Sequence, residues 1–278
     1  MSRTAAPRPR RTVASAVSIE DKGLHTGRRC RVTLVPAGAG EGVVFVRDGK
    51  RLTLDQWDPE ASRCSALKDG TVGVQTVEHV LSAVSMAGLT DLRIECTGDE
   101  LPALDGSALP FWDLIERAGT RRLEGAVDPI VIDRPVFLAQ GTSALYAEPS
   151  PDGELEVAYT LDYDHPALKD QHYAARLTAG IFAAEIAPAR TFCTRAEAEE
   201  LRRRGYGLGA DTANTLVMDT DGPVDNTLRF ADEAARHKTL DLLGDLALAG
   251  APLIGRIIGV RSGHRLNREL VRALKAQR

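Results

Sequence analysis

The sequence predicts an α+β protein of two related halves, and three observations support this class. One order of elements occurs twice: an amphipathic helix that ends at a glycine, then a strand, then a second helix. A series of short strands precedes each copy of this order. The 278 residues, of which 43% are hydrophobic, suffice for one large core or for two domains of ordinary size.

The first half is expected to end in a turn-forming segment, Glu124 to Pro129, which gives an N-terminal α+β domain over residues 1–126. Within it, Thr76 can cap a helix whose apolar residues follow helical spacing and which ends before Gly88. The expected elements are strands over 31–34 and 43–46, this helix, a strand over 92–96 and a helix over 109–118.

The second half, residues 127–278, is expected to form a C-terminal α+β domain that carries an additional segment. A βαβ-like insert around 190–220 has no counterpart in the first half, and inserts of this kind usually shape a substrate site. The other expected elements are strands over 131–138, 144–147, 155–161 and 173–177, a short helix over 179–186, a helix over 236–250, a strand over 253–260 and a last helix from His264 to about Lys275.

Composition limits which binding partners and which cellular compartment we expect. A formal net charge of −4 gives no basic surface for nucleic acid, and no stretch of sequence is long and apolar enough to span a membrane. The four cysteines form no CxxC pair, which favours reduced thiols and a cytoplasmic location. We expect a monomer. The basic first 18 residues indicate a frayed tail, with an organellar transit peptide as the alternative.

The helix from Arg236 to Gly250 places four chargeable side chains on one strip, opposite a face of Leu and Ala. His237 and Asp241 are four residues apart, so both can reach one cation. Asp245 and Lys238 lie on the same strip, within about 100° of His237. Carboxylates in such aliphatic surroundings are costly to desolvate unless they are paired or bound to metal. The alternative is a helix whose His and Asp residues make surface ion pairs.

The adjacent residues Glu78 and His79 complete this pattern. They project about 100° apart on a helix, so His79 can bind a metal ion while Glu78 faces a water beside that ion. His79 and Asp241 both lie nine positions before the glycine that closes their helix. Each half would then contribute one ligand-bearing helix to a site between them. An ordinary surface Glu-His pair is the alternative.

Five motifs follow one another along the chain: Thr-Val-Glu-His at 76–79, Asp-Gly-Ser at 105–107, Ala-Arg-Thr-Phe at 189–192, His-Lys-x-x-Asp-x-x-Gly-Asp at 237–245 and Ser-Gly-His at 262–264. In this order they resemble the UDP-3-O-acyl-N-acetylglucosamine deacetylase family, the zinc enzymes of lipid A biosynthesis. The resemblance implies two related domains, each a β-sheet layered against two helices, with small inserts and a zinc site at the domain interface.

The resemblance also implies roles for individual residues. One Zn²⁺ per chain would be held by His79, His237 and Asp241. Glu78 would be the general base and His264 the general acid, which Asp245 orients, and Thr191 would stabilise the oxyanion. The substrate-binding residues would be Lys238 near phosphate or carbonyl oxygen, Phe192 beside the acyl chain, and Asp162 and Tyr163 near the uridine.

The implied reaction removes the N-acetyl group from UDP-3-O-acyl-N-acetylglucosamine, the committed step of lipid A biosynthesis. A zinc amidohydrolase that acts on another N-acetylated sugar or nucleotide is the first alternative, and an apolar tunnel beside the metal would distinguish the two. A binding protein that kept the fold is the second. A thiol mechanism at Cys193 is disfavoured because it needs a nearby base and a lowered thiol pKa.

Overall fold

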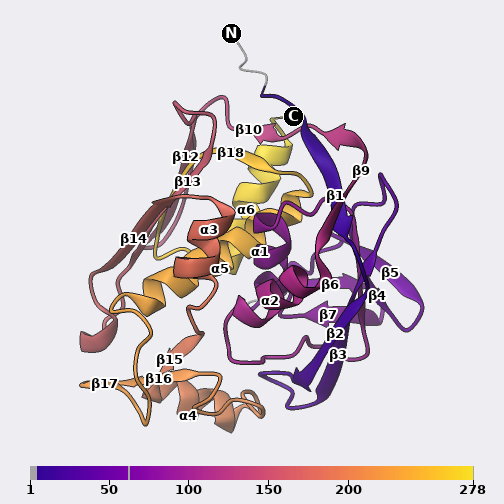
Figure 1. Cartoon of the computed structure of the whole chain (residues 1–278). Coiled ribbons are helices and arrows are strands. Elements are labelled where there is room, and N and C mark those ends of the chain that lie inside the picture. The colour runs from indigo at the N-terminus through magenta and orange to yellow at the C-terminus, as the bar shows by residue number, and fades with distance from the viewer. Residues whose placement is uncertain (1–4, 62, 278) are drawn as a thin grey trace.

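Two β-sheets flank a central group of helices in the computed structural model, which describes residues 5–61 and 63–277 (Figure 1). The described residues contain both helices and sheets, so the predicted α+β class is confirmed. The helices α1 (Glu78–Met86), α2 (Leu109–Ala118), α5 (Glu233–Leu246) and α6 (His264–Lys275) occupy the space between the sheets. Within that described part, no helix is both long and apolar enough to cross a membrane.

The first sheet has five strands in the order β2-β3-β8-β4-β5. Its centre is β8, which pairs antiparallel with β3 and parallel with β4. Side chains along β8 alternate between buried and partly buried, as expected of a strand with one face on a core. The strands are β2 (Val17–Lys22), β3 (Arg29–Pro36), β4 (Val43–Arg47), β5 (Lys50–Thr53) and β8 (Leu92–Cys96).

The second sheet repeats this arrangement in the order β11-β12-β18-β13-β14, with β10 beside β18. Its centre is β18, antiparallel to β12 and parallel to β13. The single strand predicted over 131–138 is wrong, because the segment is split into β10 and β11 around Pro135, which has no N–H to donate. The strands are β10 (Ile130–Val131), β11 (Val136–Gln140), β12 (Ser143–Glu148), β13 (Leu155–Leu161), β14 (Gln171–Arg176) and β18 (Leu253–Val260).

The basic N-terminal segment is not a frayed tail over its described residues. Residues 8–13 form β1 (Arg8–Val13), which pairs antiparallel with β9 (Thr120–Val127). Arg10 donates to the buried Asp91 carboxylate at 3.0 Å, and the side chain of Val13 is fully buried. The predicted tail was wrong because these contacts join residues about 80 to 120 positions apart, beyond the reach of any local pattern.

Helix α1 begins one residue later than predicted, at Glu78. Thr76 is not its N-cap: the N-cap is Val77, which makes no side-chain capping bond. Thr76 instead has a φ of 60°, a left-handed conformation that is unusual for a β-branched residue. The tight connection from β7 (Val72–Gln75) brings Glu78 and His79 to the first turn of the helix, where both side chains are buried.

The segment predicted as an insert, around residues 190–220, lies at the edge of the molecule below α5 in Figure 1. Its strands β15 and β16 pair in parallel, and α4 between them begins with a capping box at Thr194 and Glu197. Backbone bonds from Leu208 N to His25 O and from Gly209 N to Leu24 O, each 3.1 Å, dock it onto the first half. The remaining elements are β6 (Ala66–Asp69), η1 (Pro166–Leu168), α3 (Ala179–Ile181), η2 (Phe182–Ile186), β15 (Phe192–Thr194), α4 (Arg195–Arg203), β16 (Leu216–Asp219), β17 (Gly222–Pro223) and η3 (Ala247–Ala249).

Helices α1 and α5 touch through their backbones at Gly244. A Cβ atom on Gly244 would lie 2.0 Å from the carbonyl oxygen of Glu78. Alanine is normally favoured over glycine within a helix, but here we expect Gly244→Ala to lower the free energy of unfolding by about 1–3 kcal/mol or more through overpacking. Chemical denaturation measures the loss. In Gly180→Ala the nearest atom is 3.9 Å away, so this control should leave stability close to wild type.

Candidate active site

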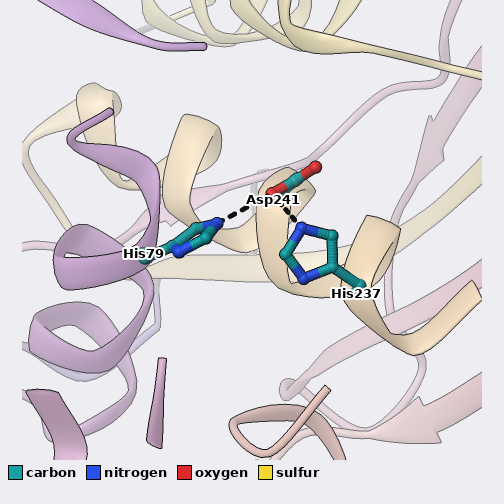
Figure 2. A group of neighbouring side chains, drawn as sticks. All are labelled: His79, His237 and Asp241. Atoms are coloured by element: carbon teal, nitrogen blue, oxygen red, sulfur yellow. Dashed lines mark ion pairs between the residues drawn. The ribbon is translucent and has the colours of Figure 1, made fainter. Parts of the chain in front are cut away.

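Three buried side chains converge where α1 meets α5. His79 Nε2 lies 3.7 Å from Asp241 Oδ1, and His237 Nε2 lies 3.4 Å from the same oxygen. Figure 2 shows both imidazoles directed at the Asp241 carboxylate, His79 from α1 and the other two residues from α5. One donor atom from each residue lies within 4.8 Å of the others. The structure therefore brings together the three predicted metal ligands.

The donor set fits a small divalent cation. Zinc binds imidazole nitrogen and carboxylate oxygen at about 2.0–2.2 Å in tetrahedral geometry, which puts neighbouring donors about 3.3–3.6 Å apart. The two nitrogen-to-oxygen separations at Asp241, 3.4 and 3.7 Å, are close to that spacing. Three protein donors also leave one position of a tetrahedron open, as in catalytic rather than structural zinc sites.

The surroundings of His237 favour the neutral imidazole, the form that can bind a metal ion. Burial lowers the pKa of His237 to about 4, although the Asp241 carboxylate acts in the opposite direction. The imidazole is therefore neutral at pH 7. Its Nδ1 lies 3.0 Å from the carbonyl oxygen of Ala189, so Nδ1 carries the proton and Nε2 presents a lone pair to the cluster.

Lys238 lies within the cluster rather than on an open surface. Its Nζ is 2.7 Å from Asp241 Oδ2, while Oδ1 of the same carboxylate faces the two imidazoles. Burial disfavours charge on both partners, yet their mutual attraction lowers the pKa of Asp241 well below its usual value and raises the pKa of Lys238. Asp241 is thus an ionised carboxylate with one oxygen directed at the two imidazole nitrogens.

Glu78 and His264 lie beside this cluster with the electrostatics of an acid-base pair. His264 Nε2 is 3.9 Å from Glu78 Oε1, and His264 Nδ1 is 2.9 Å from Asp245 Oδ2. Burial opposes charge on His264, but Asp245 and then Glu78 raise its pKa to about 9. Burial raises the pKa of Glu78. His264 therefore holds a proton at pH 7 next to a carboxylate with increased proton affinity.

Glu78, Asp241 and His264 form a second group whose donor atoms lie within 4.8 Å of one another. A protonated imidazole offers no lone pair to a metal ion, and the raised pKa of His264, about 9, keeps it protonated at pH 7. The neutral imidazole of His237 makes the group of His79, His237 and Asp241 the better cation site.

Sequence analysis did not find the residues that hold Asp245 and Glu78. Ser65 donates its N–H to Glu78 Oε2 at 2.9 Å and its hydroxyl to Asp245 Oδ1. Asn267 donates to Asp245 Oδ2 at 2.8 Å. Asn267 follows His264 by one helical turn, a spacing that could have identified it. Ser65 has no such pattern.

Thr191 is half-buried just before β15, and its N–H donates to Gly106 O at 2.8 Å. The preceding residue, Arg190, was also missed. Its buried guanidinium donates to Glu233 Oε1 at 2.8 Å and to Asn226 Oδ1 at 3.0 Å. This ion pair anchors the segment that carries both the Ala189 carbonyl and Thr191 to the start of α5.

The two aromatic residues predicted to bind substrate, Phe192 and Tyr163, lie side by side next to the cluster. The ring centroid of Phe192 lies 6.2 Å from that of His237 and 5.8 Å from that of Tyr163. Lys238 Nζ is 5.8 Å from the centre of the Phe192 ring. Asp162 is partly exposed and ion-paired with Arg261, just beyond the end of β18.

Cys193 is poorly suited to act as a nucleophile, because burial raises the pKa of its thiol to about 11 and so disfavours the reactive thiolate.

Comparison with known proteins identifies the family of this chain. The family model described as UDP-3-O-acyl N-acetylglycosamine deacetylase matches residues 10–276. A UDP-3-O-acyl-N-acetylglucosamine deacetylase of Leptospira biflexa is 37% identical, over 96% of this chain and 90% of the relative. Proteins of the same name from Anaeromyxobacter dehalogenans and Anaeromyxobacter sp. are 39% and 40% identical, again over 96% of this chain and over 87% and 88% of those relatives. The chain belongs to the UDP-3-O-acyl N-acetylglycosamine deacetylase family.

Proposed function

We propose that this protein is a zinc-dependent hydrolase that removes the N-acetyl group from UDP-3-O-acyl-N-acetylglucosamine, giving acetate and UDP-3-O-acyl-glucosamine for lipid A biosynthesis. The observation that carries the proposal is the convergence of His79, His237 and Asp241 next to the Glu78–His264 pair. The names of the relatives support the substrate.

Zinc would be held by His79, His237 and Asp241, one ion per chain. When bound, the ion supplies a Lewis acid that eases deprotonation of a water near pH 7 and offsets negative charge on the substrate carbonyl oxygen. Glu78 takes the proton of the attacking water through Oε1, the oxygen that faces His264, while Oε2 stays bonded to Ser65 N–H. Thr191 donates its hydroxyl to the oxyanion as the C–O bond forms.

His264 then acts as the general acid. An amine leaves poorly unless it is protonated, and His264 is protonated at pH 7 because its pKa is raised to about 9. The bond between Nδ1 and Asp245 leaves Nε2 as the nitrogen that delivers a proton when the C–N bond breaks. Asp245 orients the imidazole ring of His264 while it keeps its other hydrogen bonds.

The groups around the cluster suggest how the substrate lies. Phe192 and Tyr163 would contact the acyl chain and the uridine, and Lys238 would contact a phosphate or carbonyl oxygen from its position at Asp241. Asp162 would complete the nucleotide contacts. The ring of Tyr163 offers a face on which the uracil could stack.

We infer further that the chain divides near residue 126 into two domains, acts as a monomer and works in the cytoplasm. The two sheets of like strand order support the division, since β1 to β9 and β10 to β18 join separate sheets. Free thiols at all four cysteines agree with a reducing compartment.

Turnover of two substrates tests the proposed function. The enzyme should hydrolyse UDP-3-O-acyl-N-acetylglucosamine with a kcat/KM at least about 100-fold above that for UDP-N-acetylglucosamine, because each buried methylene contributes about 0.8 kcal/mol. Equal rates would identify an amidohydrolase for unacylated sugars. Phe192→Ala should reduce the preference for the acylated substrate if that ring contacts the chain.

The pH profile tests the role of Asp245. In the wild type, kcat should fall in alkali as His264 loses its proton with a pKa of about 9. Asp245→Asn removes the negative charge that raises this pKa and leaves the burial that lowers it. The alkaline limb of kcat should therefore move to lower pH by about 1–3 units. An unmoved limb would show that another group controls it.

A further inference from the structure

Ser65 joins the two proton-transferring parts of the site. It is fully buried just before β6 and bonds to the start of α1 twice: its N–H donates to Glu78 Oε2 at 2.9 Å, and its carbonyl accepts from Val77 N at 3.1 Å. Its hydroxyl donates to Asp245 Oδ1 on α5. Ser65 is thus bonded both to the proposed base and to the carboxylate that holds the proposed acid.

The direction of the Ser65 hydroxyl is fixed by Arg268. A guanidinium can only donate, and Arg268 Nη1 lies 3.4 Å from Ser65 Oγ. The hydroxyl therefore accepts from Arg268 and donates to Asp245. Arg268 also donates to Cys64 O at 3.3 Å and to Ala61 O at 2.6 Å, so α6 holds this segment in place. Arg268 is 2% exposed, which makes these bonds a buried network.

We propose that Ser65 is a positioning residue for the deacetylation reaction, which fixes the spacing between Glu78 and the His264–Asp245 pair. This inference rests on the proposed function. With Glu78 Oε2 bonded to Ser65, Oε1 is left 3.9 Å from His264 Nε2. The main-chain bonds are available to any residue other than proline at this position. The bond to Asp245 requires a hydroxyl, so serine and threonine are the two residues that supply it well.

Three substitutions separate the hydroxyl from the rest of the residue. Ser65→Ala should lower kcat by about tenfold or more, because a hydrogen bond to a charged group is lost, with KM within about twofold. Ser65→Cys keeps the shape with a weaker donor and should lie between alanine and wild type. Ser65→Thr should recover most of the lost kcat. Wild-type kcat in Ser65→Ala, or no recovery by threonine in a folded protein, would overturn the proposal.

A double-mutant cycle tests whether Ser65 acts through Asp245. In an Asp245→Asn background, Ser65→Ala should cause little further loss of kcat, whereas full additivity would contradict the proposal. Thr12→Ala is the matched control, since it removes another fully buried hydroxyl, on β1. It should lower stability without a change in kcat.

An NMR measurement is independent of turnover. The proton on Nδ1 of His264 should exchange slowly with water in the wild type and in Ser65→Thr, and at least about tenfold faster in Ser65→Ala, because Asp245 loses a donor that holds it. If the wild type fails to deacetylate the substrate, the proposed function fails, and this exchange rate alone decides the positioning role. Equal exchange in all three proteins would refute it.

Discussion

His237→Ala is expected to abolish both metal binding and deacetylation. The substitution leaves two donors, His79 and Asp241, where a catalytic zinc ion takes three. Changes that merely disturb the partner of a ligand cost about 10- to 100-fold in metal affinity, so removal of the ligand itself should cost more than about 100-fold. Metal analysis after dialysis, together with competition by a chelator, measures the loss.

The buried position of His237 requires a control for folding. His172→Ala removes a histidine that bonds to Thr160 outside the cluster, and it should keep one metal ion per chain and full turnover. Circular dichroism should show His237→Ala to be folded at the assay temperature. Wild-type zinc content in a folded His237→Ala protein would refute the assignment of this ligand.

His264→Ala is expected to lower kcat by about 100- to 10,000-fold, the usual contribution of a positioned acid. The effect should fall on kcat, because His264 acts on the leaving nitrogen in the transition state. Zinc should remain near one per chain, since His79, His237 and Asp241 are unaltered. Steady-state kinetics and metal analysis on one preparation give both values.

His264→Gln is the companion variant, because glutamine can still donate to Asp245 but carries no transferable proton at pH 7. It should be as inactive as the alanine variant. Recovery of turnover in His264→Gln would indicate that a hydrogen bond, rather than proton transfer, is what the residue supplies. Loss of zinc in either variant would favour the second donor group, Glu78, Asp241 and His264, as the metal site.

Most regular elements could be predicted from local patterns. The helix over 109–118 and the strand over 253–260 were predicted with the bounds that the structure has, because each has a clear apolar period and an end marked by glycine or a charged residue. The elements that were missed or misplaced depend on distant partners. β1 is a strand because β9 lies beside it, and Thr76 has its left-handed conformation in the short connection from β7 to α1.

In the candidate site, too, local patterns predicted some features, and others depend on contacts between distant parts of the chain. The spacing of His237 and Asp241 on one helix indicates a shared cation from sequence alone. That His79 reaches the same carboxylate depends on the packing of α1 against α5, which the repeated order of elements and the family resemblance indicated. Ser65 and Arg190 act through contacts made in the folded chain, and neither has a periodic pattern that sequence could have revealed.

The contact between Gly244 and the Glu78 carbonyl would also limit which ions the proposed metal site can accept. Because the two helices already touch through main-chain atoms, they cannot move closer, and their buried surroundings resist moving apart. The pair of imidazoles and the carboxylate therefore enclose a space of one size. An ion such as Ca²⁺, which takes six to eight oxygen ligands at about 2.3–2.6 Å, finds neither the room nor the oxygens it needs. Selectivity would thus be set by the backbone rather than by the identity of the ligands alone.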